Sequence, residues 1–235
     1  MIIHRLIAHH LRHGDDDAFY RLQAEDTVRW LKQMGIDLSI HRQALDLGCG
    51  HGILGQALQK EGCQVQFSDQ RNTLCPSLSE APFIPIDLDR DSLDALGTHD
   101  LVICSNVLEH LSDPDRFLNH CVSLLRPKGY LYLSWTNWLS FWGGHDFSPF
   151  HYLGPRLGHR VFDRLIGRKR IHTPFETLYP TYIGDTLNKI NRLEGIHVIA
   201  AIPRYYPELR PLMSVPILRE FLAWNCAILV QRGSA

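Results

Sequence analysis

Three glycines alternate with other residues directly after a short apolar run, within residues 44–55. They are Gly48, Gly50 and Gly52. Asp46 stands two residues before the first of them. Glycine lets a backbone approach a ligand where a side chain would block it. A helix beginning near Ile53 would add free N–H groups and a positive dipole end, which favour a carboxylate or phosphate. The segment therefore predicts a ligand-binding loop between a strand and a helix.

Acidic residues end the next two apolar runs of the chain. Asp69 ends the run 65–69, and Asp87 ends the run 83–87. A carboxylate at the position of Asp69 can accept both hydroxyl hydrogens of a ribose, and charged hydrogen bonds of this kind contribute about 1.5 to 3 kcal/mol. We interpret two neighbouring acids, Asp89 and Glu109, as a solvated loop acid and a helix-start charge.

The elements that must position these residues alternate along the chain. Strands are predicted over 44–47, 65–68, 83–86, 101–104, 130–135, 196–202 and 226–230, and helices over 17–34, 53–61, 114–125 and 183–193. Such alternation implies right-handed crossovers and a largely parallel sheet covered on both faces. With 235 residues and 45% apolar content, we expect one domain. Its parts are an N-terminal helical segment, a ligand-binding core, an insertion and a C-terminal part of the sheet, at 1–40, 41–136, 137–182 and 183–235.

The glycine spacing separates two families of nucleotide-binding protein. Nicotinamide dinucleotide folds use G-x-G-x-x-G, and the third glycine position of that pattern holds Ile53 here. The pattern Asp-x-Gly-x-Gly-x-Gly over 46–52 instead resembles the first motif of class I S-adenosylmethionine-dependent methyltransferases, and the resemblance extends over about 40–232. It implies a Rossmann-like α/β fold with a seven-stranded, mostly parallel sheet whose last strand is antiparallel. It also implies S-adenosylmethionine as the cofactor.

The resemblance assigns roles to individual residues. In this family the glycine loop bends around the amino-acid part of the cofactor, and the acid before it, here Asp46, positions the methionyl ammonium. Asp69 then binds the ribose and Asp87 the adenine amino group, with the backbone of Leu88 at the ring edge. Residues 99–110 resemble the strand-four segment of ubiquinone-type methyltransferases, which should lie beside the first strand. The predicted cofactor-binding residues are Asp46, Gly48, Cys49, Gly50, Gly52, Asp69, Gln70, Asp87, Leu88, Ser105 and Asn106.

Histidines are the candidate bases for such a reaction. Methyl transfer from a sulfonium is an in-line displacement, and a hydroxyl nucleophile benefits from a base within about 3 Å. We rank His110 first because it follows the strand-four segment, and His145 and His151 of the insertion second and third. The set His145, Asp146 and His151 would also offer metal ligands, but its spacing matches no recognised pattern, so no metal site is predicted.

Charge and turn chemistry bear on the acceptor. The chain has 24 basic and 25 acidic residues, so no overall field draws it onto nucleic acid. Nucleic-acid amine methyltransferases resemble one another in a Pro-Pro-aromatic turn, whereas residues 105–108 read Ser-Asn-Val-Leu. We expect O-methylation of a small molecule, quinone, lipid or sugar hydroxyl, and no nucleic-acid partner.

Residues 137–182 break the alternation and form an aromatic-rich insertion that we expect to cap the site. The aromatic residues at and after its start are Trp135, Trp138, Phe141, Trp142, Phe147, Phe150 and Tyr152. A basic run, 168–170, follows them. Two interpretations stay open: a hydrophobic lid packed on the sheet, or a surface that holds an aromatic or lipid-linked substrate or touches a membrane interface. Scattered cysteines and the lack of a secretory or membrane-spanning pattern favour a cytoplasmic protein, with peripheral contact at the inner membrane face as the alternative.

A second resemblance concerns the insertion and the C-terminal part. Segments 137–140, 143–145, 151–154 and 203–207 are similar to those of bacterial methyltransferases of unassigned substrate. Two other hypotheses remain: a methyltransferase-like protein that binds the cofactor without turnover, and a nicotinamide-dependent oxidoreductase.

Overall fold

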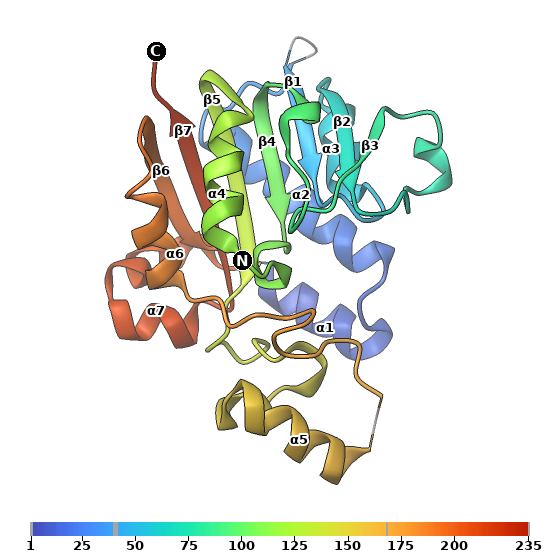
Figure 1. The fold of residues 1–235 in the computed structure, drawn as a ribbon, viewed down its shortest axis with the longest axis vertical. Helices are drawn as coiled ribbons and strands as arrows, with labels where there is room; N and C mark the ends of the chain where they lie inside the picture. Colours follow the sequence, from blue (N-terminus) through green and yellow to red (C-terminus); the bar gives the residue numbers. More distant parts are fainter. Residues whose placement is uncertain (1, 40–41, 168, 235) are drawn as a thin grey trace.

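Seven strands form one sheet in the order β3-β2-β1-β4-β5-β7-β6 (Figure 1). The computed structural model describes residues 2–39, 42–167 and 169–234. The strands are β1 (Gln43–Leu47), β2 (Gln64–Asp69), β3 (Phe83–Pro85), β4 (His99–Ser105), β5 (Leu125–Thr136), β6 (Ile196–Pro203) and β7 (Asn225–Arg232). The first five pair in parallel, and β7 runs antiparallel to both of its neighbours. The predicted α/β fold, with a largely parallel sheet and an antiparallel last strand, is confirmed.

The central strands are apolar on both faces because both faces are covered. Neighbouring residues of a strand point to opposite faces. Leu45 and Val102 therefore pack in one core cluster, and Leu101 and Ile103 pack in the other. All four side chains are at most 1% exposed. This double burial produces the continuous apolar runs that predicted a parallel sheet.

Helices and turns connect the strands. The α-helices are α1 (Ile3–His13), α2 (Asp17–Gln33), α3 (Ile53–Lys60), α4 (Pro114–Ser123), α5 (Pro155–Ile166), α6 (Ile183–Ile190) and α7 (Pro216–Leu222). Short 3-10 helices are η1 (Pro76–Leu78), η2 (Asp94–Leu96), η3 (Leu108–His110), η4 (His145–Phe147), η5 (Phe150–Leu153) and η6 (Pro207–Ser214). Asp16 and Asp113 start α2 and α4 by accepting backbone N–H groups. The helix predicted over 114–125 ends earlier because Leu125 already pairs with His99 of β4.

Two segments outside the alternation lie beyond the carboxyl ends of the parallel strands. Figure 1 shows α1 and α5 on that side of the sheet, α1 nearer to it. The backbone N–H of Ile2 donates to the Tyr205 carbonyl at 3.1 Å, which ties the start of α1 to the chain after β6. Within the described ranges, no helix combines the length and apolarity needed to span a bilayer.

Candidate active site

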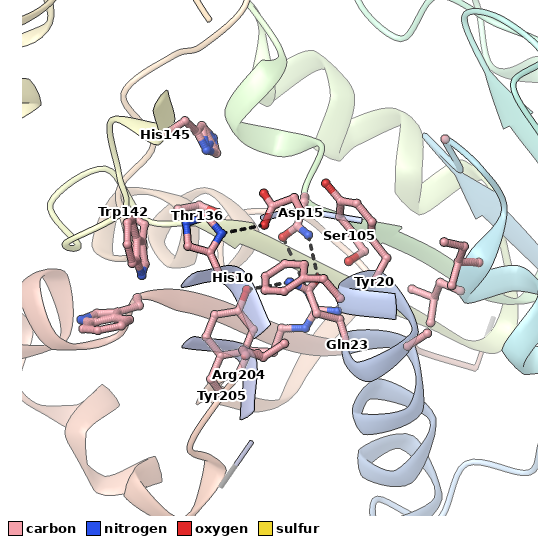
Figure 2. Close-up of a pocket in the computed structure, with 18 of the residues that line it drawn as sticks. His10, Asp15, Tyr20, Gln23, Ser105, Thr136, Trp142, His145, Arg204 and Tyr205 are labelled. Carbon is pink, nitrogen blue, oxygen red and sulfur yellow. Dashed lines mark hydrogen bonds and ion pairs between the residues drawn. The ribbon is translucent and has the colours of Figure 1, made fainter. Parts of the chain in front are cut away.

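A cavity of about 800 Å³ opens at the carboxyl ends of β1 and β4. These strands are neighbours at the place where the strand order changes direction, the usual ligand site of open α/β sheets. The glycine loop and the end of β4 form one part of its wall. Side chains from α1, α2 and the insertion contribute further wall residues, as Figure 2 shows for His10, Tyr20 and Trp142. The end of β5 and the C-terminal part of the chain complete the wall.

The three glycines of the loop have different tasks. Gly48, Gly50 and Gly52 have φ of 72°, 51° and 76°, values that L side chains rarely adopt. A Cβ on Gly48 would lie 2.4 Å from Val107, and one on Gly52 would lie 2.6 Å from Leu74. A Cβ on Gly50 would meet no described atom within 4 Å. Two glycines thus permit close packing, and Gly50 leaves room beside the cavity.

Asp46 places a carboxyl group in the cavity wall, with only 3% of the residue exposed. Its Oδ2 accepts the backbone N–H of Gly55 at 2.8 Å. Burial raises the pKa of Asp46 to about 7, and the charge of Asp69 adds to this shift. The group is therefore close to a change of charge at neutral pH, and a cationic ligand group beside it would favour the ionised form.

Hydrogen bonds connect the other predicted acids, Asp69 and Asp87, to the glycine loop and to Gln70. Asp69 accepts the Gly50 N–H at 2.8 Å, and the Gln70 side-chain amide donates to Asp87 at 3.0 Å. Asp87 also accepts the backbone N–H of Asp89 at 3.0 Å. Among the predicted cofactor residues, those in the cavity wall are Asp46, Gly48, Cys49, Gly50, Ser105 and Asn106. Those placed outside it are Gly52, Asp69, Gln70, Asp87 and Leu88.

Three histidine rings gather on another side of the same cavity. The ring centroids are 5.4 Å apart for His110 and His145, 5.3 Å for His110 and His172, and 4.8 Å for His145 and His172. Nδ1 of His110 lies 2.6 Å from the Thr177 carbonyl oxygen, and Nδ1 of His172 lies 3.0 Å from Asp146 Oδ1. Because these oxygens accept, both Nδ1 atoms carry hydrogen. The Nε2 atom of each neutral ring therefore holds the free lone pair.

His145 and Glu109 contribute buried polar atoms to the cluster. In the part of the chain that the structure describes, Nε2 of His145 and Oε2 of Glu109 have no hydrogen-bond partner. Oε1 of Glu109 accepts the backbone N–H of Thr136 at 2.8 Å. Burial raises the pKa of Glu109, and burial together with His172 and His110 lowers the pKa of His145 to about 3. His145 is accordingly a weak proton acceptor. Glu109 does stand in the first turn of η3, but it is buried rather than a surface charge.

His151, the third predicted base, is not brought to the cavity. The residue is 0% exposed, and its Nε2 lies 3.0 Å from the Ser140 carbonyl oxygen. Its ring packs edge-on against Trp138 at 5.6 Å. The set of His145, Asp146 and His151 is therefore split between the cavity wall and the interior of the insertion.

The sequence missed the wall residues that come from both ends of the chain. His10 of α1 meets the Trp142 ring edge-on at 5.1 Å and closes one side of the cavity. In the cavity wall, Asn106 Oδ1 accepts from Asn225 at 2.8 Å and from the buried wall residue Arg204 at 3.4 Å. The Pro-Arg-Tyr-Tyr-Pro segment at 203–207 was the only sequence feature that pointed to this region.

The aromatic residues of the insertion divide into two groups. Trp138 and Phe147 are buried with Phe162 and Leu178 in a small core of their own, separate from the two core clusters of the sheet. Phe141 and Tyr152 are 46% and 47% exposed. Membrane contact stays a prediction. Of the basic run at 168–170, residue 168 lies outside the described residues, and Arg170 pairs with Asp163 at 2.6 Å.

Comparison with known proteins adds to this geometry. The model of a family described as methyltransferase domain matches residues 18–193. An uncharacterized methyltransferase of Mycobacterium sp. (strain JLS) is 33% identical, over 93% of this chain and 89% of its own. One from Mycobacterium leprae (strain Br4923) is 30% identical, over 91% and 82%.

Solved structures show the same fold. An S-adenosylmethionine-dependent methyltransferase from Mesorhizobium loti matches with a TM-score of 0.59 and 19% identity, over 87% of this chain and 96% of that one. The magnesium protoporphyrin IX methyltransferase of Synechocystis, solved with bound SAH, matches with a TM-score of 0.56 and 19% identity, over 92% and 86%.

Proposed function

We propose that this chain, which belongs to the class I S-adenosylmethionine-dependent methyltransferases, methylates a hydroxyl group. The acceptor would be a small molecule, quinone, lipid or sugar. Family membership decides against the nicotinamide-dependent oxidoreductase. The observation that carries the proposal is one cavity whose wall holds both the glycine loop and a histidine cluster. One side suits the cofactor, and the other suits an acceptor that must lose a proton.

The residues present fit the cofactor. S-adenosylmethionine supplies an electrophilic methyl group on a sulfonium when bound. Gly50 leaves open space for its amino-acid part, and Asp46 offers a buried carboxylate to its ammonium group. Asp69 keeps acceptor positions for ribose hydroxyls besides those used by the backbone N–H groups of Gly50 and Gln70.

The histidine cluster provides the base for the acceptor hydroxyl. His110 and His172 both line the cavity and both keep Nε2 free to accept a proton. The carboxylate of Asp146 orients His172 and would stabilise the imidazolium that forms, as in other acid–histidine pairs. We therefore place His172, which the sequence did not single out, beside His110 as the base.

Calorimetry and product analysis test the function. Titration with S-adenosylmethionine is expected to show one site, and incubation with hydroxylated acceptors is expected to release S-adenosylhomocysteine. Absence of binding would overturn the proposal. Binding without turnover across quinol, sugar and lipid acceptors would instead support the alternative of a cofactor-binding protein without transferase activity.

The Asp69→Ala variant is expected to bind S-adenosylmethionine about 10-fold to 150-fold more weakly. The loss follows from about 1.5 to 3 kcal/mol for hydrogen bonds to a charged group. Isothermal titration calorimetry measures it, with the melting temperature checking that the loop is still folded. A dissociation constant equal to that of the wild type would remove Asp69 from the ribose site.

A glycine pair separates strain from ligand contact. Gly50→Ala and Gly97→Ala both place a Cβ at positive φ, 51° and 72°, with no described atom within 4 Å. Both are expected to lower stability by a similar amount, about 1 kcal/mol. Only Gly50→Ala should weaken cofactor binding, because only Gly50 lines the cavity. Equal cofactor affinities in the two variants would show that the loop does not contact the cofactor.

A further inference from the structure

The histidine side of the cavity has the composition of a metal site. Glu109, His110 and His145 each present one potential ligand atom, and these atoms lie within 4.8 Å of one another. Glu109 and His110 belong to η3 and His145 belongs to η4, and the rings of His110 and His145 stack with centroids 5.4 Å apart. We propose that Glu109, His110 and His145 bind one divalent transition-metal ion, of the zinc class, in the wall of the cavity.

Two buried atoms in this cluster lack partners. Oε2 of Glu109 and Nε2 of His145 are buried without a hydrogen bond among the described residues. Most buried polar atoms in folded proteins have a partner, so two unmet atoms within one cluster of potential metal ligands favour a ligand there. A cation satisfies a carboxylate oxygen and an imidazole lone pair together.

The other ligand atoms are oriented by outer contacts. The Thr177 carbonyl takes the Nδ1 hydrogen of His110 and turns its Nε2 lone pair outward. The Thr136 N–H holds one oxygen of Glu109 and leaves the second free. Metal-binding histidines almost always donate their other N–H in this way, and ligating carboxylates are likewise hydrogen-bonded.

The backbone at His145 also favours a special role. His145 has φ of 48°, in the left-handed region that costs energy for residues other than glycine. The turn before it is tight, because a Cβ on Gly143 would lie 1.8 Å from the Trp138 carbonyl oxygen. Metal–ligand distances of about 2.0 to 2.1 Å imply ligand atoms about 3.4 Å apart in a tetrahedron, so binding would draw the cluster together.

The donor set selects the kind of metal. Two imidazoles and one carboxylate form the ligand set of open zinc sites and of iron(II) sites with free positions. Magnesium and calcium prefer oxygen ligands alone. The remaining positions of the ion would face the cavity, because His110 and His145 both line it.

The consequence for the reaction rests on the proposed function. An acceptor hydroxyl on the ion would lose its proton more easily, and Nε2 of His172 would receive that proton. The oxygen lone pair would then form the O–CH₃ bond while the S–CH₃ bond breaks, and its electron pair would stay on sulfur. The ion would thus activate the acceptor without taking part in cofactor binding.

Metal titration of the full, untagged and chelator-stripped chain tests the site, with ZnCl₂ alone as the probe. The wild type is expected to bind one equivalent of Zn²⁺ by calorimetry and elemental analysis, and Co²⁺ in its place should give visible d–d absorption. Glu109→Gln keeps an acceptor for Thr136, and His145→Asn suits the positive φ. Each should weaken binding by more than the 10-fold to 100-fold typical of outer contacts.

The N-terminal helix supplies the matched control. His9 and His13 stand one turn apart on α1, with ring centroids 4.9 Å apart, and form an ordinary surface pair that can chelate zinc. The double variant His9→Gln, His13→Gln should still bind one equivalent of Zn²⁺. If zinc binding is lost in this control and kept in folded Glu109→Gln and His145→Asn proteins, the proposal is overturned, as it is if the wild type binds no zinc.

Cofactor titration of the same proteins keeps the two proposals apart. S-adenosylmethionine should bind to the wild type and to Glu109→Gln with equal affinity. Cofactor binding without zinc binding would remove the metal site and leave the methyltransferase function. Zinc binding that depends on Glu109 and His145, without cofactor binding, would remove the methyltransferase function and leave the metal site.

Discussion

At pH 8 the Asp46→Asn variant is expected to melt at a higher temperature than the wild type in the absence of cofactor. Burial raises the pKa of Asp46 from 3.8 to about 7. A carboxyl pKa raised in the folded state gives stability that is present below about pH 4 and is lost as the pH rises through about 7. The rise in pKa from 3.8 to about 7 corresponds to a loss of about 4 kcal/mol in the free energy of unfolding. Asn is neutral and still accepts the Gly55 N–H, so the variant avoids this loss.

The same Asp46→Asn substitution should lower the affinity for the cofactor although it raises the melting temperature. Removing one partner of a buried ion pair costs about 3 to 5 kcal/mol, so Asp46→Asn should bind S-adenosylmethionine at least 100-fold more weakly at pH 8. Scanning calorimetry at pH 5 and pH 8, with and without cofactor, measures both effects. Asp100→Asn, at the opposite end of β4, serves as a control whose cofactor affinity should be unchanged. Unaltered affinity in Asp46→Asn would show that Asp46 does not hold the ammonium group.

The fold and the glycine-loop side of the cavity were predictable because their determinants are local. The glycine loop, the preceding acid and the helix after it lie within one short segment, 46–60, and the strand periodicity reflects burial on both faces. Helix ends were less predictable. The helix expected to reach residue 125 stops at Ser123 because strand pairing with β4 takes over, and pairing is a tertiary effect.

The histidine side of the cavity was only partly predictable because distant segments assemble it. His110 and His172 are 62 residues apart in the sequence, and no motif connects them. The path of the insertion depends on the small core around Trp138 and Phe147, which spacing alone does not reveal. The place of helix α1 in the cavity wall was not predictable from the helical segment expected over 1–40, because its contacts with Tyr205 and Trp142 are tertiary.

His172→Asn is expected to lower kcat by about 10²-fold to 10⁴-fold, which corresponds to about 2.7 to 5.4 kcal/mol, the usual contribution of general base catalysis. The Asn side-chain amide can still donate to Asp146 in place of Nδ1, but it offers no basic lone pair at the position of Nε2. The cofactor dissociation constant should therefore stay unchanged. Steady-state release of S-adenosylhomocysteine with an identified acceptor measures kcat, and calorimetry measures binding.

Two further variants make this result specific to the base. Asp146→Asn keeps an oxygen for the His172 N–H but removes the charge that stabilises the imidazolium, so its kcat should fall less than that of His172→Asn. If His172→Asn retains full kcat, the pairing of His172 with Asp146 is only structural. Loss of kcat in His110→Asn would then assign the base to His110 if that variant still binds zinc, because a variant that has lost zinc would be inactive for want of the ion. The free Nε2 of His110 is the feature that makes this outcome a physical alternative, because both rings line the same cavity with the same tautomer.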